Sequence, residues 1–273
     1  MANEVIEEAR NNKKQCLIVK LEFEKAYDSV SWDFLYYMLG TLGFGTKWVS
    51  WIKACLESSK ISVLVNGSPT QEFTPTRGLR QGDPLAPLLF LLIAEGLSGL
   101  VRQSDKMNLL EGIRVGRNKL NVNMLQFADD TLFFCKPSSN DLVDIKSILR
   151  CFELASGLKI NFHKSKLGGV GVGEDELLRS SNILNYGLMN VPFKYLGVCV
   201  GGNLRRKQFW EPVVNKIKKK LTRWKGRFLS FAGRVCLLKS VLTFVPLYYM
   251  SLFKMPIIVS KDIMRIQRKF LWG

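Results

Sequence analysis

Short apolar runs separated by turn residues characterise the first 200 residues of the chain. The run CLIVKLEF at 16–23 predicts a buried strand. Alternating glycines and valines at 166–173 are interpreted as leading into a loop. Paired apolar segments predict three hairpins, around Asn66-Gly67, over 120–135 and over 191–202.

Other segments carry apolar residues at helical spacing. Ser31 and Ser138 are each predicted to begin a helix, because their hydroxyls suit the N-cap position. The Ser138 helix resembles a capping box with Asp141 and is expected to end at Gly157. Helices are also predicted at 1–14, 46–58, 84–103 (a very apolar core helix), 207–228, 235–244 and from 260 onward.

The mixture of strands and helices lacks regular βαβ alternation. It predicts an α+β core followed by an all-helical basic module. The stripe of the first C-terminal helix is formed by Trp210, Val213, Val214, Ile217, Leu221, Trp224 and Phe228. Core packing is the first interpretation of these aromatic residues, and stacking on a nucleic-acid backbone is the alternative.

Positive charge is concentrated in one part of the sequence. The whole chain has a net charge of +17, and its last 73 residues contain 17 basic residues against Glu211 and Asp262, a net of +15. Such a segment should meet a polyanion, either nucleic acid or an anionic membrane surface. The longest uncharged run, 240–253, contains Pro246 and is shorter than the roughly 18 residues of a membrane span, so no membrane partner is expected.

Composition excludes several classes of protein. With 47% hydrophobic and 23% charged residues, the chain is neither disordered nor collagen-like. None of the six cysteines forms a C-x-x-C pair, and most lie in apolar stretches, so free buried thiols in a reducing, intracellular compartment are expected. A single histidine, His163, argues against a histidine metal site or a Ser-His-Asp triad.

The adjacent carboxylates Asp129 and Asp130 have apolar neighbours on both sides. They repel each other and lose hydration, and a divalent cation such as Mg²⁺ would offset both costs. Glu22, at the end of a predicted strand, could complete a two-metal phosphoryl-transfer site. The alternatives are a solvent-exposed Asp-Asp turn and, for Glu22, an ordinary surface acid.

The loop TPTRGLRQGDPLAP opens a predicted helix and carries Arg77, Arg80 and Gln81. Arginines and backbone amides at a helix N-terminus can bind phosphates, and Gln81 could contact a base or sugar. A plain Gly-Asp-Pro turn is the alternative.

Five ordered segments together resemble the palm motifs of reverse transcriptases, most closely those of plant-type non-LTR (LINE-like) retrotransposons. They are KLEFEKAYDSVSWDFL, RGLRQGDPLAPLLF, FADD, SGLKINFHKSK and FKYLGVCVGG. The resemblance implies a right-handed polymerase palm with partial fingers at 1–201 and a truncated, basic, thumb-like region at 202–273. It also implies an RNA template, a DNA primer, dNTPs, Mg²⁺ (with Mn²⁺ as an alternative ion) and a nuclear location.

The resemblance also implies roles for particular residues. Metal binding and catalysis would fall to Asp129, Asp130 and Glu22. Contacts to the incoming nucleotide and template would involve Phe23, Tyr27 (as the gate against a ribose 2′-hydroxyl), Arg80, Gln81, Gly82 and Lys164 (as a proton donor to pyrophosphate). The primer grip would be Tyr195, Leu196 and Gly197.

The sequence departs from the family pattern where the family has Asp and this chain has Glu22. The added methylene displaces the carboxylate, and weak or absent catalysis is expected. We also expect the upstream fingers region and the end of the thumb to be missing. The rival hypotheses are a non-catalytic nucleic-acid-binding relic and a peripheral membrane protein.

Overall fold

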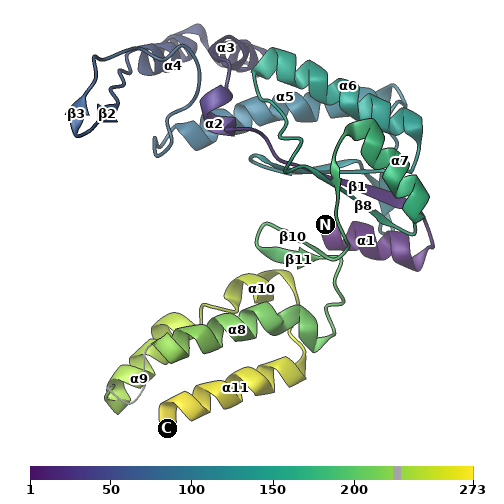
Figure 1. Cartoon of the computed structure of the whole chain (residues 1–273), viewed down its shortest axis with the longest axis vertical. Helices are drawn as coiled ribbons and strands as arrows, with labels where there is room; N and C mark the ends of the chain where they lie inside the picture. The colour runs from purple at the N-terminus through teal and green to yellow at the C-terminus, as the bar shows by residue number, and fades with distance from the viewer. Residues whose placement is uncertain (224–228, 273) are drawn as a thin grey trace. The chain divides into compact units, whose positions relative to one another are not determined.

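The computed structural model describes residues 1–223 and 229–272. The chain forms two compact units, Met1–Val191 and Pro192–Gly273 (Figure 1). Trp224 and Phe228, which were predicted to extend the apolar stripe of the first C-terminal helix, lie outside the described residues.

The first unit contains a five-stranded sheet in the order β6-β7-β1-β8-β9. The pairs are antiparallel except for β8 and β9, which run parallel. The strands are β1 (Cys16–Leu21), β6 (Met124–Phe127), β7 (Asp130–Cys135), β8 (Lys166–Val170) and β9 (Gly187–Leu188). The central strand β1 is therefore the predicted buried strand, with a β-neighbour on each side.

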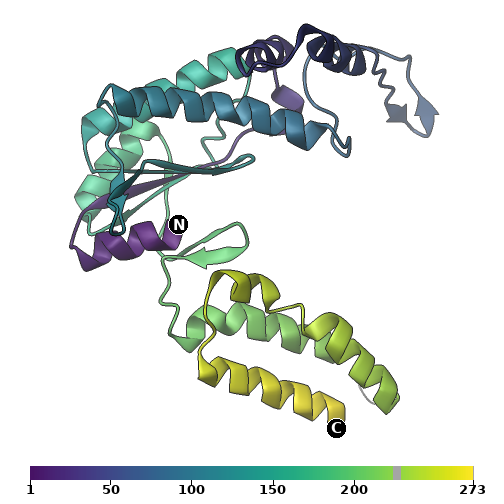
Figure 2. The ribbon, with the colours of Figure 1, turned by 180° about the vertical axis from the view of Figure 1, so that it is seen from behind.

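Alternation along β1 gives the sheet two different faces. Leu17, Val19 and Leu21 point into the main hydrophobic core, together with Phe133 and Phe90. Helices α5 (Ala86–Lys106) and α6 (Ser139–Ser156) cover this face, and α1 (Ala2–Asn11) lies across the other, as Figures 1 and 2 show. The opposite face begins with the fully buried Ile18 and continues through Lys20 towards Glu22.

The remaining elements of the first unit connect or cover this sheet. They are α2 (Ala26–Ser29), α3 (Trp32–Thr41), α4 (Thr46–Glu57), β2 (Leu64–Val65), β3 (Ser68–Pro69), β4 (Ile113–Val115), β5 (Leu120–Val122) and α7 (Glu174–Leu184). The predicted Ser31 cap is confirmed, because its hydroxyl accepts a hydrogen bond from Phe34 N at 3.3 Å. The Asn66-Gly67 hairpin is also confirmed, with positive φ at both turn residues.

The second unit combines one hairpin with helices. Its elements are β10 (Phe193–Tyr195), β11 (Val198–Val200), α8 (Lys207–Arg223), α9 (Phe231–Leu237), a π-helical turn (Leu238–Leu242), α10 (Leu247–Leu252) and α11 (Ile257–Trp272). Trp210 and Ile217 of α8 are fully buried against residues of α11, which confirms the described part of the predicted stripe. The predicted boundary between regions at 201/202 stays a prediction.

Two strand predictions were wrong. Residues 166–170 form β8 rather than leading directly into a loop. An added Cβ would lie 3.0 Å from Met189 O at Gly168 and 2.7 Å from Leu177 Cδ2 at Gly169, so close packing requires glycines in this strand. Residues 120–135 are also not one hairpin, because Leu120–Val122 pairs with β4 and only 124–135 surrounds the carboxylates.

The cysteine prediction was half right. All six cysteines are free, and Cys16 and Cys135 are buried. Cys55, Cys151 and Cys236 are exposed, and Cys199 is partly buried. Burial raises the pKa of the Cys16 thiol to about 12.

Within residues 1–223 and 229–272, two segments are long and apolar enough to cross a membrane, Ala86–Lys106 and Phe231–Leu252. The first is α5, which supplies Phe90, Ile93 and Leu97 to the core of its own unit. The second is interrupted by the π-helical turn, and its Arg234 donates to the carbonyl of Leu271 at 3.0 Å. Length and apolarity alone are weak arguments for a span, and the absence of a membrane partner stays a prediction.

The segment between β1 and α3 is held by backbone bonds from one distant loop, at Gly78 and Leu79. Leu79 N donates to Tyr27 O at 2.6 Å and Gly78 N donates to Val30 O at 2.8 Å. The indole of Trp32 donates in turn to Gly78 O at 2.7 Å. These bonds fix the loop that carries Arg80 and Gln81 against the end of β1.

Replacing Gly78 with alanine should destabilise the first unit. Gly78 has φ +90°, and an added Cβ would lie 2.8 Å from the carbonyl oxygen of Asp28. We expect a loss of about 1–3 kcal/mol in unfolding free energy, measured by thermal or denaturant unfolding. Gly43→Ala is the matched control, because its φ is +83° with nothing within 4 Å of the added Cβ. Equal losses for the two variants would contradict the importance of the Asp28 contact.

Candidate active site

The turn between β6 and β7 presents the two adjacent carboxylates. Phe127 pairs with Asp130, so Ala128 and Asp129 form the tip, and Ala128 adopts φ +52°. Asp129 is exposed, whereas Asp130 is half-buried at the start of β7. The predicted hairpin with the carboxylates at its tip is confirmed in this respect.

Strand register brings the third carboxylate to the same place. Leu21 pairs with Thr131 across β1 and β7. Glu22 follows Leu21, and Asp130 precedes Thr131, so the antiparallel register sets Glu22 opposite Asp130 on one face of the sheet. The backbone of Glu22 is anchored by its N–H donating to Ser165 Oγ at 3.2 Å, and its carbonyl accepting from Asn161 N at 2.8 Å.

Electrostatics reflect this convergence. Partial burial is the main cause that raises the pKa of Asp130 above its usual range, followed by the negative charge of Asp129. Glu22 raises the pKa of Asp130 further, while Lys20 acts in the opposite direction. The pair therefore holds negative charge at a free-energy cost in the folded protein.

Lys20 is the residue that sequence reasoning missed. Its Nζ lies 3.1 Å from Glu22 Oε1, and both side chains are partly buried. A strand places residues i and i+2 on the same face, so their spacing in the sequence was a usable signal.

The donor set suits a hard divalent cation, since carboxylate oxygens are the ligands that Mg²⁺ prefers. Asp129, Asp130 and Glu22 are the side chains that would hold it. Among the described residues, however, no three His, Cys, Asp or Glu side chains are already grouped to hold a metal ion. The three carboxylates are therefore suitable ligands for a divalent metal ion, but that of Glu22 forms an ion pair with Lys20.

The predicted nucleotide-contacting residues lie around this centre in different settings. Phe23 bridges to Ile160 and packs edge-on against Phe152. Tyr27, in α2, stacks on Phe90 with ring centroids 4.8 Å apart. Lys164 is exposed, and its N–H donates to Asn161 Oδ1 at 3.1 Å.

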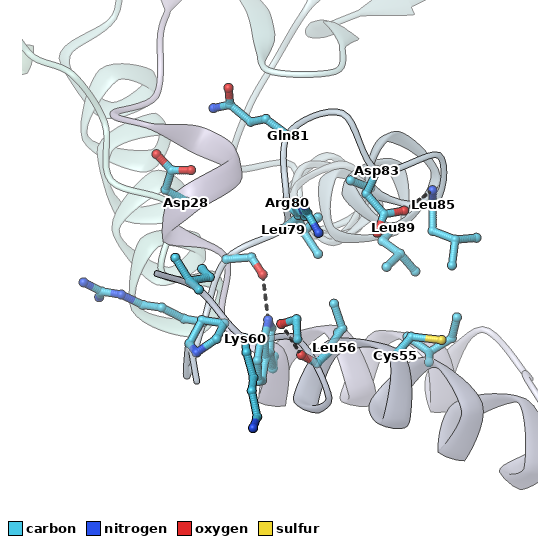
Figure 3. A pocket seen from close by; sticks show the side chains of 18 of the residues that line it. Asp28, Cys55, Leu56, Lys60, Leu79, Arg80, Gln81, Asp83, Leu85 and Leu89 are labelled. Carbon is cyan, nitrogen blue, oxygen red and sulfur yellow. Dashed lines mark hydrogen bonds between the residues drawn. The ribbon is translucent and has the colours of Figure 1, made fainter. Parts of the chain in front are cut away.

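Arg80 and Gln81 line a cavity of about 780 Å³. Figure 3 shows the 79–89 segment along one side of the cavity and α4, with Cys55 and Leu56, along the opposite side. Arg80 and Gln81 are exposed, while Leu79, directly before them, is buried and anchors the backbone. Gly82, at φ +90°, has nothing within 4 Å of an added Cβ and lies outside the lining. The cavity thus combines several exposed polar side chains, Lys60 and Arg77 among them, with apolar ones such as Leu89.

The predicted primer-grip residues belong to the second unit. Tyr195 is buried, and Leu196 and Gly197 form a turn with positive φ. The hydroxyls of Tyr248 and Tyr249 donate to the carbonyls of Leu196 and Gly197 at 2.8 and 3.1 Å. These tyrosines, which no sequence motif had indicated, tie the turn to α10.

Replacing Asp130 with Asn should stabilise the fold at neutral pH, because it removes a partly buried charge. The raised pKa means that the folded state binds a proton more tightly than the unfolded state, so the charge costs stability above the folded-state pKa. The gain in melting temperature should shrink as the pH falls through that pKa and vanish below the unfolded value of about 3.9. A gain that persists in strong acid would contradict this origin.

The comparisons with known proteins agree with this arrangement. The family model "Reverse transcriptase (RNA-dependent DNA polymerase)" matches residues 2–200. The Xenopus laevis transposon TX1 149 kDa protein is 27% identical over 97% of this chain. The Drosophila melanogaster type-2 retrotransposable element Pol polyprotein is 30% identical over 61% of it. An uncharacterized mitochondrial protein of Arabidopsis thaliana is 54% identical over 25% of the chain.

The chain spans only part of these relatives: 20%, 15% and 56% of their respective lengths. Among solved structures, telomerase of Candida albicans, in a complex with a fragment of telomeric RNA, matches with a TM-score of 0.54 at 13% identity. It covers 98% of this chain and 42% of the telomerase chain. Telomerase of Candida tropicalis gives a TM-score of 0.53 at 11% identity, over 96% and 40% of the two chains. These likenesses show the fold, a mixed α/β palm followed by a helical module.

Proposed function

Because this chain belongs to the reverse transcriptase (RNA-dependent DNA polymerase) family, we propose that it contributes the palm and part of the thumb of an RNA-directed DNA polymerase. The parent element would be a non-LTR retrotransposon, by its similarity to the transposon and type-2 element proteins. The reaction would be transfer of the nucleoside monophosphate of a dNTP to a primer 3′-hydroxyl on an RNA template, with release of pyrophosphate as the α–β phosphoanhydride bond breaks. The nuclear location expected for this family is part of the same proposal.

The observation that carries the proposal is the register that sets Glu22 opposite Asp130, with Asp129 next to it in the turn between β6 and β7. Mg²⁺ held by these carboxylates would activate the hydroxyl and neutralise charge on the transferred phosphoryl group. The half-buried position of Asp130 keeps water away from one side of the centre, which strengthens its interaction with any cation.

Around that centre, we assign positioning tasks to this chain's own groups. Tyr27 is fixed by its stack on Phe90, so its edge would offer a rigid barrier to a ribose 2′-hydroxyl. Arg80 and Gln81, on a loop anchored through Leu79, would meet the phosphate and base of the incoming nucleotide. Phe23 would offer its backbone carbonyl and Lys164 its ammonium, while Gly82 would leave room for the template.

The turn at Leu196 and Gly197 would hold the primer backbone. Two tyrosine hydroxyls donate hydrogen bonds to its carbonyls and hold the turn in place. The other side of the turn would then be available to the primer. Tyr195, buried beneath, anchors the hairpin that presents it.

Primer extension on an RNA template with a DNA primer and Mg²⁺ tests the proposal. We expect weak extension by the native chain and none by Asp129→Asn. Glu22→Asp should extend about ten- to a hundredfold faster, because it returns the carboxylate to the geometry of the family. Circular dichroism of each variant controls for folding. Undiminished extension by Asp129→Asn would contradict the assigned site.

A second candidate function, nucleic-acid binding without catalysis, is favoured by the charge of the C-terminal unit. Lys216, Lys218 and Lys219 are exposed on α8, whose opposite side packs through Val213 and Ile217 into the core of that unit. A face of this kind can follow a phosphate backbone.

Substituting Lys216, Lys218 and Lys219 together with Gln should weaken RNA–DNA hybrid binding and lower its salt dependence. Each lost phosphate contact should reduce the slope of log affinity against log salt by about 0.9. Fluorescence anisotropy across a salt series measures it. Lys53→Gln is the control, since Lys53 lies on α4 and forms an ion pair with Glu57. An unchanged slope in the triple variant would remove α8 from the binding surface.

A further inference from the structure

The Glu22 carboxylate already has a cation beside it, one supplied by the same strand. Lys20 Nζ lies 3.1 Å from Glu22 Oε1, and the two side chains are 21% and 34% exposed. Exposed ion pairs contribute little, but this pair is shielded by its own sheet, so solvent screening is reduced.

The register explains why the lysine is directed to this centre. Lys20 pairs with Leu132 on β7 and with Lys166 on β8. Neither of these directly opposite residues is acidic. The nearest acidic positions on that face are one pair further along, at Glu22 and Asp130. Lys20 also lowers the pKa of Asp130, which indicates that its charge reaches both carboxylates.

The length of the Glu22 side chain matters to this contact. A glutamate carries its carboxylate one methylene further from the backbone than an aspartate does, so it can fold back along β1 to the side chain two residues earlier. The methylene that separates this chain from the family pattern is therefore also the group that permits the ion pair.

We propose that Lys20 is an internal counter-cation that competes with a divalent metal for Glu22 and sets the metal affinity of the site. A metal ion that takes Glu22 as a ligand must displace the Lys20 ammonium. This inference rests on the proposed function, because it takes Asp129, Asp130 and Glu22 as the metal ligands. Lys20 acts through Glu22 and is a positioning residue.

The test is a titration of the full chain with Mn²⁺ at one neutral pH. The electron paramagnetic resonance signal of free Mn²⁺ measures how much of the ion is bound. Lys20→Met should bind Mn²⁺ about three- to tenfold more tightly than the native chain. Lys20→Arg keeps the charge and should keep the native affinity. Lys20→Gln, with a polar side chain, gives a second neutral variant if the methionine variant folds poorly by circular dichroism.

Lys166→Met is the matched control, because it removes the same charge from the position paired with Lys20 on β8. It should tighten binding by less than Lys20→Met does. In a Glu22→Asp background, Lys20→Met should add little, since the shorter side chain has already released the lysine. Equal effects of the Lys20 and Lys166 variants, or no tightening in either neutral Lys20 variant, would overturn the competition.

Asp130→Asn separates this inference from the proposed function. If it abolishes Mn²⁺ binding while the Lys20 variants bind like the native chain, the metal site stands and the role of Lys20 is overturned. If it leaves Mn²⁺ binding unchanged, the assignment of the metal ligands is wrong, and the proposed competition by Lys20 is overturned as well.

Discussion

The antiparallel pairing of β1 with β7 determines which acidic side chains can meet. Because Leu21 lies opposite Thr131, Glu22 and Asp130 come together without any loop having to fold over them. A shift of one residue in this register would turn Asp130 towards the apolar core and move Phe133, which is fully buried there, to the opposite face of the sheet. The core face of the sheet thus enforces the geometry of its charged face.

This dependence explains how the site tolerates its own electrostatic cost. The partly buried Asp130, with the negative charges of Asp129 and Glu22 near it, destabilises the folded state, and its raised pKa reflects that cost. The hydrophobic core on the other face, built on Leu17, Val19 and Phe133, supplies the opposing free energy. The candidate site lies at the end of strands whose positions the hydrophobic core already fixes.

Much of this could be predicted from the sequence. The strand at Cys16–Leu21, the hairpin bearing Asp129-Asp130 and the Ser31 cap follow from local patterns that the structure preserves. Strand β8 could not be predicted. Its Gly168 and Gly169 lie close to Met189 and Leu177, and these contacts form only in the tertiary fold. Likewise, no motif indicates that Tyr248 and Tyr249 bond the turn at Leu196, some fifty residues earlier. The roles assigned to the individual site residues stay predictions.

The Lys20–Glu22 pair changes how the departure at position 22 is understood. A longer acid could be regarded only as a displaced metal ligand, with the loss confined to geometry. In this chain the Glu22 carboxylate also pairs with Lys20, 3.1 Å away, so a cation entering the site would meet a carboxylate that already has a positively charged partner. If the proposed function holds, displacement of the carboxylate and competition from Lys20 would both weaken catalysis. The two causes differ in one respect. Competition disappears when the lysine is neutralised, whereas misplacement of the carboxylate does not. The Mn²⁺ affinity of the Lys20 variants therefore separates these two causes, whereas a loss of polymerase activity could come from either.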